Sequence, residues 1–328
     1  MKIFFIFKSR YRRSHLNNFI KIKKIGIYKF INFSGPYLYW LGNLFILLKI
    51  GKGISCDGNP IIKNKFGINF WMGGTNFKIL PKFRYMKNNY VNMRSIFNNN
   101  DNLFQIYPLN IKKHHEHEKK KIIYISDIKI TDDKNVLKFW NSNKSHILKD
   151  FTLIDKLYFW KKYIFYNDIE KCFFYYRSIK HLLRFNIVKT LKKKYKENFI
   201  LRGSNWSKYG LPSLFNEYDL NKNLNLYNGN ICIDLGSISG SLSLYPRSIN
   251  IIESGGLLIQ QKQNDLSVIW KKKYYNRINF FQNYKSLFFS IDFFLDNKLL
   301  FDKCLEKQKK NFHNSETLIE KQLKKNLI

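Results

Sequence analysis

The sequence predicts an α/β protein of two domains, each built around a mostly parallel sheet. Two observations lead to this fold class. Short apolar segments typical of buried strands alternate with segments of helical spacing, and this alternation favours a parallel sheet with helices on its faces. The chain also has 328 residues with a 45% hydrophobic share, which is enough for two buried cores.

The first predicted unit is a strand, a turn and a helix near the N-terminus. Lys24–Phe30 has the composition of a strand, and Tyr37–Lys49 has the length and apolar spacing of a helix. Gly51 and Gly53 are expected to end this helix, because glycine readily leaves the helical conformation. Ile61–Trp71 is a second strand candidate, so the N-terminal third is expected to form an abbreviated α/β domain.

A domain boundary is predicted at the polar run Lys112–Lys121 (KKHHEHEKKK). We therefore expect an N-terminal domain over residues 1–115, a second domain over residues 120–290, and a C-terminal helix with a polar tail over residues 291–328. The tail beyond Asn311 is polar and is expected to attach loosely.

The second domain has the clearest alternation of strands and helices. Its four predicted strands are Lys121–Asp127, Asn198–Gly203, Asn230–Gly236 and Leu257–Gln261. Ser178–Tyr195 has apolar residues at helical spacing, and Asp132 or Asp133 could cap an earlier helix. Pro246–Ser254 is predicted as a short helix with proline in its first turn, and Asp265–Trp270 as the start of another.

The ends of the predicted strands carry the residues that could bind a ligand, because ligands of parallel α/β sheets lie beyond the carboxyl ends of the strands. These ends are Ser126-Asp127, Gly203-Ser204-Asn205 and the segment Gly236–Tyr245 (GSISGSLSLY). The last segment leads directly into the Pro246 helix, whose N-terminal N–H groups could bind an anion. Arg247 in the first turn could pair with a phosphate, so a phosphate-bearing ligand is predicted.

The stretch Asn230–Gln261 (NICIDLGSISGSLSLYPRSINIIESGGLLIQQ) resembles the donor-binding segment of GT-B glycosyltransferases. It is most similar to the CgeB-like group and to sugar transferases with a C-terminal domain of the glycosyl transferases group 1 type. In these proteins a strand and a loop lead to a helix that carries Arg, with an acidic residue three positions later. A turn of one small residue and two glycines follows, and then a hydrophobic strand. The matching residues are Arg247, Ser254-Gly255-Gly256 and Leu257-Leu258-Ile259.

Two further segments carry the resemblance. Phe199–Trp206 (FILRGSNW) is similar to the family's strand, glycine and tryptophan piece. Tyr107–Asn110, followed by Ile122–Ser126, looks like the passage between the two domains. The resemblance covers roughly residues 105–270, and the N-terminal third matches only in its opening strand, glycine loop and helix.

The resemblance implies a GT-B architecture of two Rossmann-like domains, with the N-terminal one abbreviated, and transfer of a sugar from a nucleotide-diphosphate donor. The acceptor would be a growing glycan, a lipid-linked glycan or a surface-polysaccharide precursor, held against the N-terminal loops Ser34-Gly35-Pro36 or Gly73-Gly74. It also implies a mechanism without a bound metal. The nucleotide sugar is a substrate, no cofactor is expected, and no residue is identified as the catalytic base.

The donor site implied by the resemblance draws on all three strand ends and on the helix that follows the last one. Its residues are Gly203, Ser204, Asn205, Ser237, Ser239, Gly240, Ser243, Tyr245, Arg247, Asn250, Ser254 and Gly255. Arg247 and the helix N-terminus would stabilise the diphosphate leaving group. Asn250 would meet the ribose, where the family usually has Glu, and the loss of the charge predicts a weaker contact.

The net charge of +35 predicts attraction to polyanions. It fits peripheral docking on an anionic inner membrane leaflet. A basic nucleic-acid-binding protein is the main alternative, but the sequence has no RNA-binding motif and no zinc module, so no nucleic acid is expected. A degenerate GT-B domain that binds its donor without turnover is a second alternative, because of Asn250.

The N-terminus and the cysteines bear on location. Met1–Arg13 lacks the features of a signal peptide, and the apolar run Pro36–Ile50 is shorter than the roughly 20 residues of a membrane span. The four cysteines are scattered, as in a reducing compartment. A cytoplasmic location is therefore expected.

Several of these residues also have purely structural interpretations. Arg247 could be a surface residue at a helix start, and Gly255-Gly256 a simple helix stop. The cluster His114-His115-Glu116-His117 could bind a metal, but in a lysine-flanked run it is more often a solvated charge run. The aromatic residues interleaved with lysine over Leu157–Arg184 favour core packing over stacking on bases.

Overall fold

The computed structural model describes residues 1–7, 23–34, 36–56, 67–71, 90–92, 107–160, 169–213, 220–236, 244, 246–263 and 266–327. The chain divides into two compact units. The first unit comprises Met1–Asn110 together with Phe312–Ile328, and the second comprises Ile111–Asn311. Both are α/β structures around a mainly parallel sheet, as the sequence predicts.

The sheet of the first unit has the strand order β2-β3-β1-β4-β5-β6. The strands are β1 (Lys2–Phe7), β2 (Lys24–Ile25), β3 (Tyr28–Ser34), β4 (Lys52–Cys56), β5 (Gly67–Trp71) and β6 (Tyr90–Asn92). All neighbouring pairs are parallel except β2 and β3, which form an antiparallel hairpin. The hairpin corrects the prediction of one strand over Lys24–Phe30, because Gly26 turns the chain with φ +52°.

The central strand of this sheet, β1, was not predicted. Ile3–Phe7 is apolar but directly follows Lys2, and only Ile3 and Phe4 have described side chains, both fully buried. The short segment lacks the period-two alternation that marks a half-buried strand, because a central parallel strand is covered on both faces. Its pairing with β3 on one side and β4 on the other gives it the central position.

Helix α2 (Pro36–Leu47) connects β3 to β4, close to the predicted bounds. Its inner face packs Tyr39 and Ile46 against Phe4 and Phe33, whose ring centroids are 5.2 Å apart. The helix does not end at Gly51 as predicted. It ends at Leu47, and Lys49 just beyond it takes the left-handed conformation with φ 57° while the amides of Lys49 and Ile50 bond back to the last turn.

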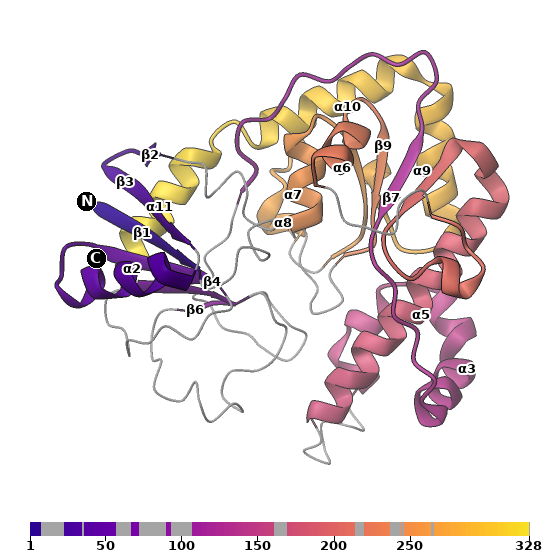
Figure 1. Ribbon diagram of the computed structural model, residues 1–328. Helices are drawn as coiled ribbons and strands as arrows, with labels where there is room; N and C mark the ends of the chain where they lie inside the picture. The colour runs from indigo at the N-terminus through magenta and orange to yellow at the C-terminus, as the bar shows by residue number, and fades with distance from the viewer. Residues whose placement is uncertain are drawn as a thin grey trace. The chain divides into compact units, whose positions relative to one another are not determined.

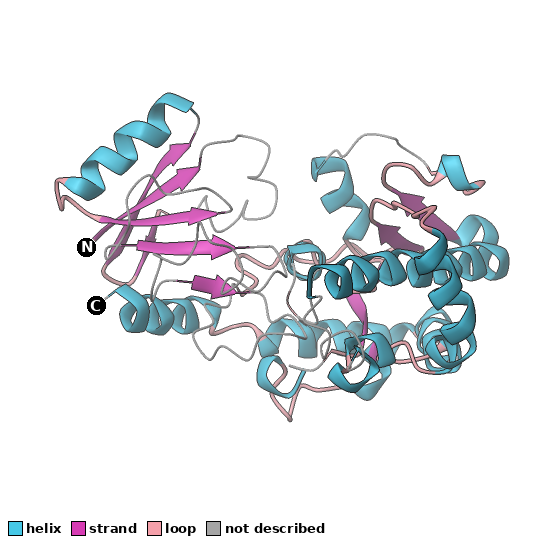
Figure 2. Cartoon of the chain, turned by 90° about the horizontal axis from the view of Figure 1, so that it is seen from below, coloured by secondary structure: helices cyan, strands magenta, loops and turns pink. Residues whose placement is uncertain are grey.

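The C-terminal residues form helix α11 (Ser315–Leu327), so the expectation of a loosely attached tail was wrong. Ile319 and Leu323, four residues apart on one helix face, are fully buried. α11 contacts β2 and β5. Figure 2 shows the strands of this sheet with one helix on either side.

The sheet of the second unit is entirely parallel, with the strand order β11-β10-β9-β7-β8. Its strands are β7 (Ile122–Ile125), β8 (Phe199–Arg202), β9 (Ile231–Asp234), β10 (Leu257–Gln261) and β11 (Phe280–Phe281). The four longer strands confirm the predicted ones. Every residue of β7, β9 and β10 is buried, which is why each reads as a continuous apolar run.

Helices cover both faces of this sheet (Figure 1). The α-helices of this unit are α3 (Lys134–Lys149), α5 (Ile169–Tyr195), α6 (Leu220–Tyr227), α7 (Pro246–Glu253), α8 (Leu266–Ile269), α9 (Tyr284–Asp296) and α10 (Lys298–Asn311). The short 3-10 helices are η4 (Leu153–Asp155), η5 (Leu157–Trp160), η6 (Lys196–Asn198), η7 (Ser207–Tyr209) and η8 (Arg277–Asn279). The predicted cap of α3 is Asp133, whose carboxylate accepts from the amides of Asn135 and Val136 at 2.9 Å. Among the described residues, no helix is both long and apolar enough to cross a membrane.

The parallel strands of the two units follow one order. Numbered along the chain within each unit, they lie as 2-1-3-4-5, with β3-β1-β4-β5-β6 in the first and β8-β7-β9-β10-β11 in the second. In this order the chain crosses from one side of the first strand to the other, so a topological switch point lies between strands 1 and 3. In the second unit that point lies between the carboxyl ends of β7 and β9.

Candidate functional site

Two strand ends meet at the switch point of the second unit. β7 is followed by Ser126 and β9 ends in Asp234, with Leu235 and Gly236 after it. Asp234 is fully buried, and its carboxylate accepts from the Gly236 amide at 3.0 Å and from Gln260 Nε2 at 3.1 Å. A buried carboxylate needs such partners, since its transfer from water without them is costly.

Arg247 spans the switch point from the first turn of α7. One guanidinium nitrogen donates to Asp234 Oδ1 at 3.0 Å, and the other donates to Ser126 Oγ at 3.1 Å. The guanidinium also lies 5.7 Å from the ring centroid of Tyr124. The Arg247 side chain is 13% exposed, whereas that of Asp234 is 0% exposed. The predicted arginine is therefore held in one orientation by the ends of both strands.

A second arginine, Arg184 of α5, bridges the same two strand ends. Its Nη1 donates to Ser126 Oγ at 3.4 Å, and its Nη2 donates to the Gly236 carbonyl. Arg184 is 3% exposed. The Ser126 hydroxyl thus lies between two guanidinium groups, one from α5 and one from α7. Sequence reasoning missed Arg184 because it counted only the apolar positions of this helix.

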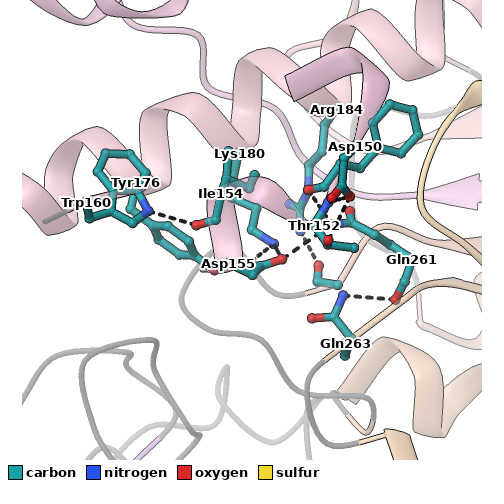
Figure 3. Close-up of polar contacts among 12 residues, drawn as sticks. Asp150, Thr152, Ile154, Asp155, Trp160, Tyr176, Lys180, Arg184, Gln261 and Gln263 are labelled. Atoms are coloured by element: carbon teal, nitrogen blue, oxygen red, sulfur yellow. Dashed lines mark hydrogen bonds and ion pairs between the residues drawn. The ribbon is translucent and has the colours of Figure 1, made fainter. Parts of the chain in front are cut away.

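Arg184 belongs to a polar face of α5 that also carries Tyr176 and Lys180. The three residues follow one another at intervals of four, so they lie on one side of the helix. The spacing of a tyrosine and two cations at intervals of four was the available signal. Figure 3 shows Lys180 and Tyr176 directed toward Asp155, with Arg184 beside them.

Asp155 is the carboxylate partner on this side of the site. Lys180 Nζ lies 2.9 Å from Asp155 Oδ1, and the Tyr176 hydroxyl donates to the same carboxylate at 2.7 Å. Gln261 Nε2, at the end of β10, lies 3.4 Å from Asp155 Oδ2 (Figure 3). Burial lowers the pKa of Lys180 against the opposing effect of Asp155, and burial together with Asp155 raises the pKa of Tyr176.

Several charged groups gather at the carboxyl edge of the sheet. The cations are Arg184, Arg247 and Lys180, and the carboxylates that bind Arg247 and Lys180 are Asp234 and Asp155. Guanidinium groups at a strand end suit recognition of a negatively charged ligand such as a phosphate.

The end of β8 adjoins the same place. Gly203 has φ +126°, and a Cβ on it would lie 2.1 Å from the Ser126 carbonyl oxygen, so only glycine fits here. The next amide, Ser204 N, donates to Asp127 Oδ1 at 2.8 Å, and Asn205 takes the left-handed conformation with φ 69°. The structure therefore brings Gly203 and Ser204, two of the three predicted β8-end residues, against the β7 end.

His181 lies beside Arg184 on α5, and its Nδ1 is 3.4 Å from the Lys129 amide. Burial, followed by the charges of Arg184, Arg177 and Lys129, lowers the pKa of His181 to about 3, against the opposing effect of Asp127. The imidazole is therefore neutral at pH 7. Its neutrality reflects its burial first, and then the positive charge around the middle of α5 and the end of β7.

The remaining predicted donor residues fall into three groups. Ser237, Ser239, Gly240, Ser243 and Tyr245 lie outside the described residues. Asn250 is three residues after Arg247 in α7, so the two share a helix face. Ser254 and Gly255 lie at the other end of α7.

Ser254 and Gly255 are not brought together with Arg247. Gly255 has φ +79° and ends α7, with the amides of Gly255 and Gly256 bonded to the last turn of the helix. Its carbonyl accepts from the Gly229 amide at 3.1 Å, beside the amino end of β9. Asp234 and Arg247 lie at the opposite, carboxyl end of that strand. The helix-stop interpretation of Gly255 thus describes its local geometry.

The members of the histidine cluster contact Asn228 and two residues of α10. The amide of His115 and the ring of His117 both contact Asn228, at 2.5 and 3.0 Å. His114 Nε2 lies 3.7 Å from Asp302, and Glu116 binds Lys298 at 2.9 Å. Among the described residues, no group of three or more histidine, cysteine or acidic side chains is arranged to hold a metal ion.

Comparisons of the chain with protein-family models, with curated proteins and with solved structures found no match.

Proposed function

We propose that the protein is a glycosyltransferase that moves a sugar from a nucleotide-diphosphate donor to a glycan, lipid-linked or surface-polysaccharide acceptor. The observation that carries the proposal is the pair of arginines, Arg184 and Arg247, that converge on Ser126 at the switch point of the second sheet. This is the place where ligands of open parallel sheets bind. The same Arg247 heads the segment that resembles the family's donor site.

The chemistry of sugar transfer suits this arrangement. When the glycosidic bond of the donor breaks, negative charge develops on the departing diphosphate. Fixed cations and helix N–H groups stabilise that charge without reorganising during the reaction. Contacts with Asp234 and Ser126 hold the Arg247 guanidinium in position. The ion pair with Asp234 thus orients Arg247 toward the diphosphate.

The GT-B arrangement is the finer part of the proposal. Two parallel sheets with the same strand order support it, since that architecture pairs two Rossmann-like domains. The acceptor would bind the first unit at Ser34-Gly35-Pro36 or Gly73-Gly74. Ser34 ends β3, whereas Gly35, Gly73 and Gly74 lie outside the described residues. A cytoplasmic location is also part of the proposal, and the buried free thiols of Cys232 and Cys304 fit a reducing compartment.

Turnover of nucleotide sugars tests the proposal. The protein is incubated with a panel of nucleotide sugars and glycan or lipid-linked acceptors, and release of the nucleoside diphosphate is measured. Arg247→Ala is expected to lower the rate about 100-fold or more, by loss of charge stabilisation. The matched control is Arg277→Ala, which removes an exposed arginine of η8. Rates equal for both variants, or no release with any donor, would rule out the proposed reaction.

A donor-binding domain without turnover is the second candidate. It is favoured by Asn250, which lacks the charge of the family's Glu, and by the engagement of Arg247 with the buried Asp234. Asn250→Glu distinguishes the two. A large gain in donor affinity, with no release of nucleoside diphosphate by the wild type, would support the second candidate. Turnover by the wild type excludes it.

A further inference from the structure

Helix α2 exposes an apolar face of unusual extent. The exposed fractions are 88% for Tyr37, 46% for Leu38, 57% for Trp40, 40% for Leu41, 48% for Leu44, 59% for Leu47 and 60% for Leu48. No charged residue occurs between Pro36 and Leu48. The one polar side chain, Asn43, is buried and donates to the Tyr39 carbonyl at 2.8 Å. The solvent side of the helix therefore carries no charged residue and consists of leucine, tyrosine and tryptophan.

Both faces of α2 are apolar, but only one is used within the first unit. Tyr39 and Ile46 pack on the sheet, which accounts for the inner face. A surface helix of a globular protein normally places polar residues on its outer face. A contiguous apolar patch of this kind marks an interaction site.

Lysines lie on the same side of the sheet as α2. Lys2 and Phe4 are two residues apart on β1, so they point to one face, and Phe4 packs under α2. Lys29 is opposite Lys2 in the parallel register, and Lys24 is opposite Lys29 in the hairpin. These three lysines therefore share the α2 face. Like charges directly opposite in a sheet repel one another, so an anionic surface against this face would relieve the repulsion.

We infer that the outer face of α2 docks on an anionic lipid bilayer, with the helix lying in the plane of the interface. The leucines enter the boundary between head groups and acyl chains, where Tyr37 and Trp40 also suit the amphipathic environment. Lys2, Lys24 and Lys29 contact the anionic head groups. The net charge of +35 is complementary to such a surface. This inference is independent of the sugar-transfer proposal, because none of its residues belongs to the donor site.

A second copy of the chain is a poorer occupant for this face. In a two-fold symmetric pair, the same patch of each protomer faces the other. The lysines beside α2 would then be brought toward their counterparts, and like charges across an interface oppose association. An anionic bilayer instead provides an apolar acyl-chain region and negatively charged head groups at the same surface.

Vesicle flotation of the full chain tests the contribution of the exposed leucines of α2 to bilayer binding. The probes are phosphatidylcholine vesicles with and without about one third phosphatidylglycerol. Leu44→Gln/Leu48→Gln is expected to weaken binding to the anionic vesicles roughly 30-fold, because both leucines lose their apolar burial. The matched control is Leu299→Gln, at a leucine of α10 that is 82% exposed, and its binding should equal that of the wild type.

The contribution of the lysines beside α2 is tested with separate variants. Lys24→Gln/Lys29→Gln is expected to weaken binding to anionic vesicles roughly 20-fold and to leave binding to neutral vesicles unchanged. Lys134→Gln/Lys138→Gln, which removes two exposed lysines of α3, is the control for a general loss of charge and should have a smaller effect.

Trp40 provides a test that does not depend on a disruptive variant. Lipids with brominated acyl chains should quench part of the tryptophan fluorescence of the wild type, and Trp40→Phe should remove that part. Three results would overturn the inference. They are no binding to anionic vesicles at low salt, equal binding by the leucine variant and the Leu299→Gln control, and self-association of the wild type that the leucine variant abolishes.

Discussion

The two sheets of this protein follow the same strand order but bury different kinds of residue. Six charged side chains are buried in the described part of the second unit: Asp155, Lys180, Arg184, Arg202, Asp234 and Glu253. In the described part of the first unit no charged side chain is buried, and Asn43 and Ser315 are its buried polar residues. The first unit instead leaves a helix face of leucine, tyrosine and tryptophan exposed.

The comparison shows how little the strand order says about chemistry. A shared order places a switch point between strands 1 and 3 in both sheets. Only in the second unit does the described structure set two arginines across that point. Buried charges are costly unless they are paired, so their presence at a strand end is informative about function in a way that the fold is not.

The largest effect is expected from removing the carboxylate of Asp155. Asp155→Ala leaves the Lys180 ammonium, which is 1% exposed, without its carboxylate and should cost about 3–5 kcal/mol of unfolding free energy. Hydrogen exchange should show faster opening of the second unit and unchanged protection in the first. Equal loss of protection in both units would show that the buried Asp155–Lys180 pair does not stabilise the second unit in particular.

Two further variants sharpen this result. Asp155→Leu/Lys180→Met should recover most of the lost stability, because it removes both buried charges at once. The exposed pair Lys298–Glu116, at 2.9 Å with side chains 60% and 71% exposed, is the surface comparison. Glu116→Ala should leave the unfolding free energy nearly unchanged.

A smaller loss is expected at the junction of β7 and β8. Gly203→Ala places a Cβ against the Ser126 carbonyl and should cost about 3 kcal/mol through backbone strain and displacement of Ser126. Gly210 also has positive φ, at +74°, but nothing lies within 4 Å of its Cβ position. Gly210→Ala should therefore cost only about 1 kcal/mol. Urea unfolding of Gly203→Ala and Gly210→Ala measures how much stability is lost through the contact with Ser126. Equal losses of unfolding free energy in the two variants would show that the contact contributes nothing.

The smallest effect in this series concerns pH. His181 has a folded-state pKa of about 3, below its ordinary value of 6.5, so the unfolded chain binds more protons between those values. Stability should therefore fall by about 2 kcal/mol as the pH drops from 6.5 toward 4. His181→Gln should flatten that part of the curve, measured by thermal unfolding. An unchanged slope in the variant would show that burial and the cations around His181 do not lower its pKa.

The sequence predicted the second unit well because its signals are local. β7, β8, β9 and β10 are buried apolar runs, and Asp133 and Gly255 mark helix ends by their own chemistry. The fold of the first unit was harder to predict from the sequence. β1 reads as a short basic and apolar segment, and the left-handed residue after α2 is Lys49, which has no intrinsic preference for that conformation.

The candidate site was predicted only in part, for a similar reason. The strand-end rule led to Ser126, Gly203 and Arg247, which the structure brings together. Arg184 lies 58 residues from Ser126 along the chain, and no local pattern links them. Asp234 could have been noticed as an acidic residue inside an apolar strand, which requires a buried partner.

Thermal unfolding with a panel of nucleoside diphosphates tests the central claim most directly, because a ligand that binds only the folded state must raise the midpoint. The proteins compared are the wild type, Arg247→Lys, Arg184→Lys and the control Arg277→Lys. Lysine keeps the charge beside Asp234 but loses the planar guanidinium. One nucleoside diphosphate, at about 100 times its dissociation constant, should stabilise the wild type and the control by ~2.7 kcal/mol and the other two variants much less. No shift in folded wild-type protein with any nucleoside diphosphate, or the same shift in all four proteins, would contradict it.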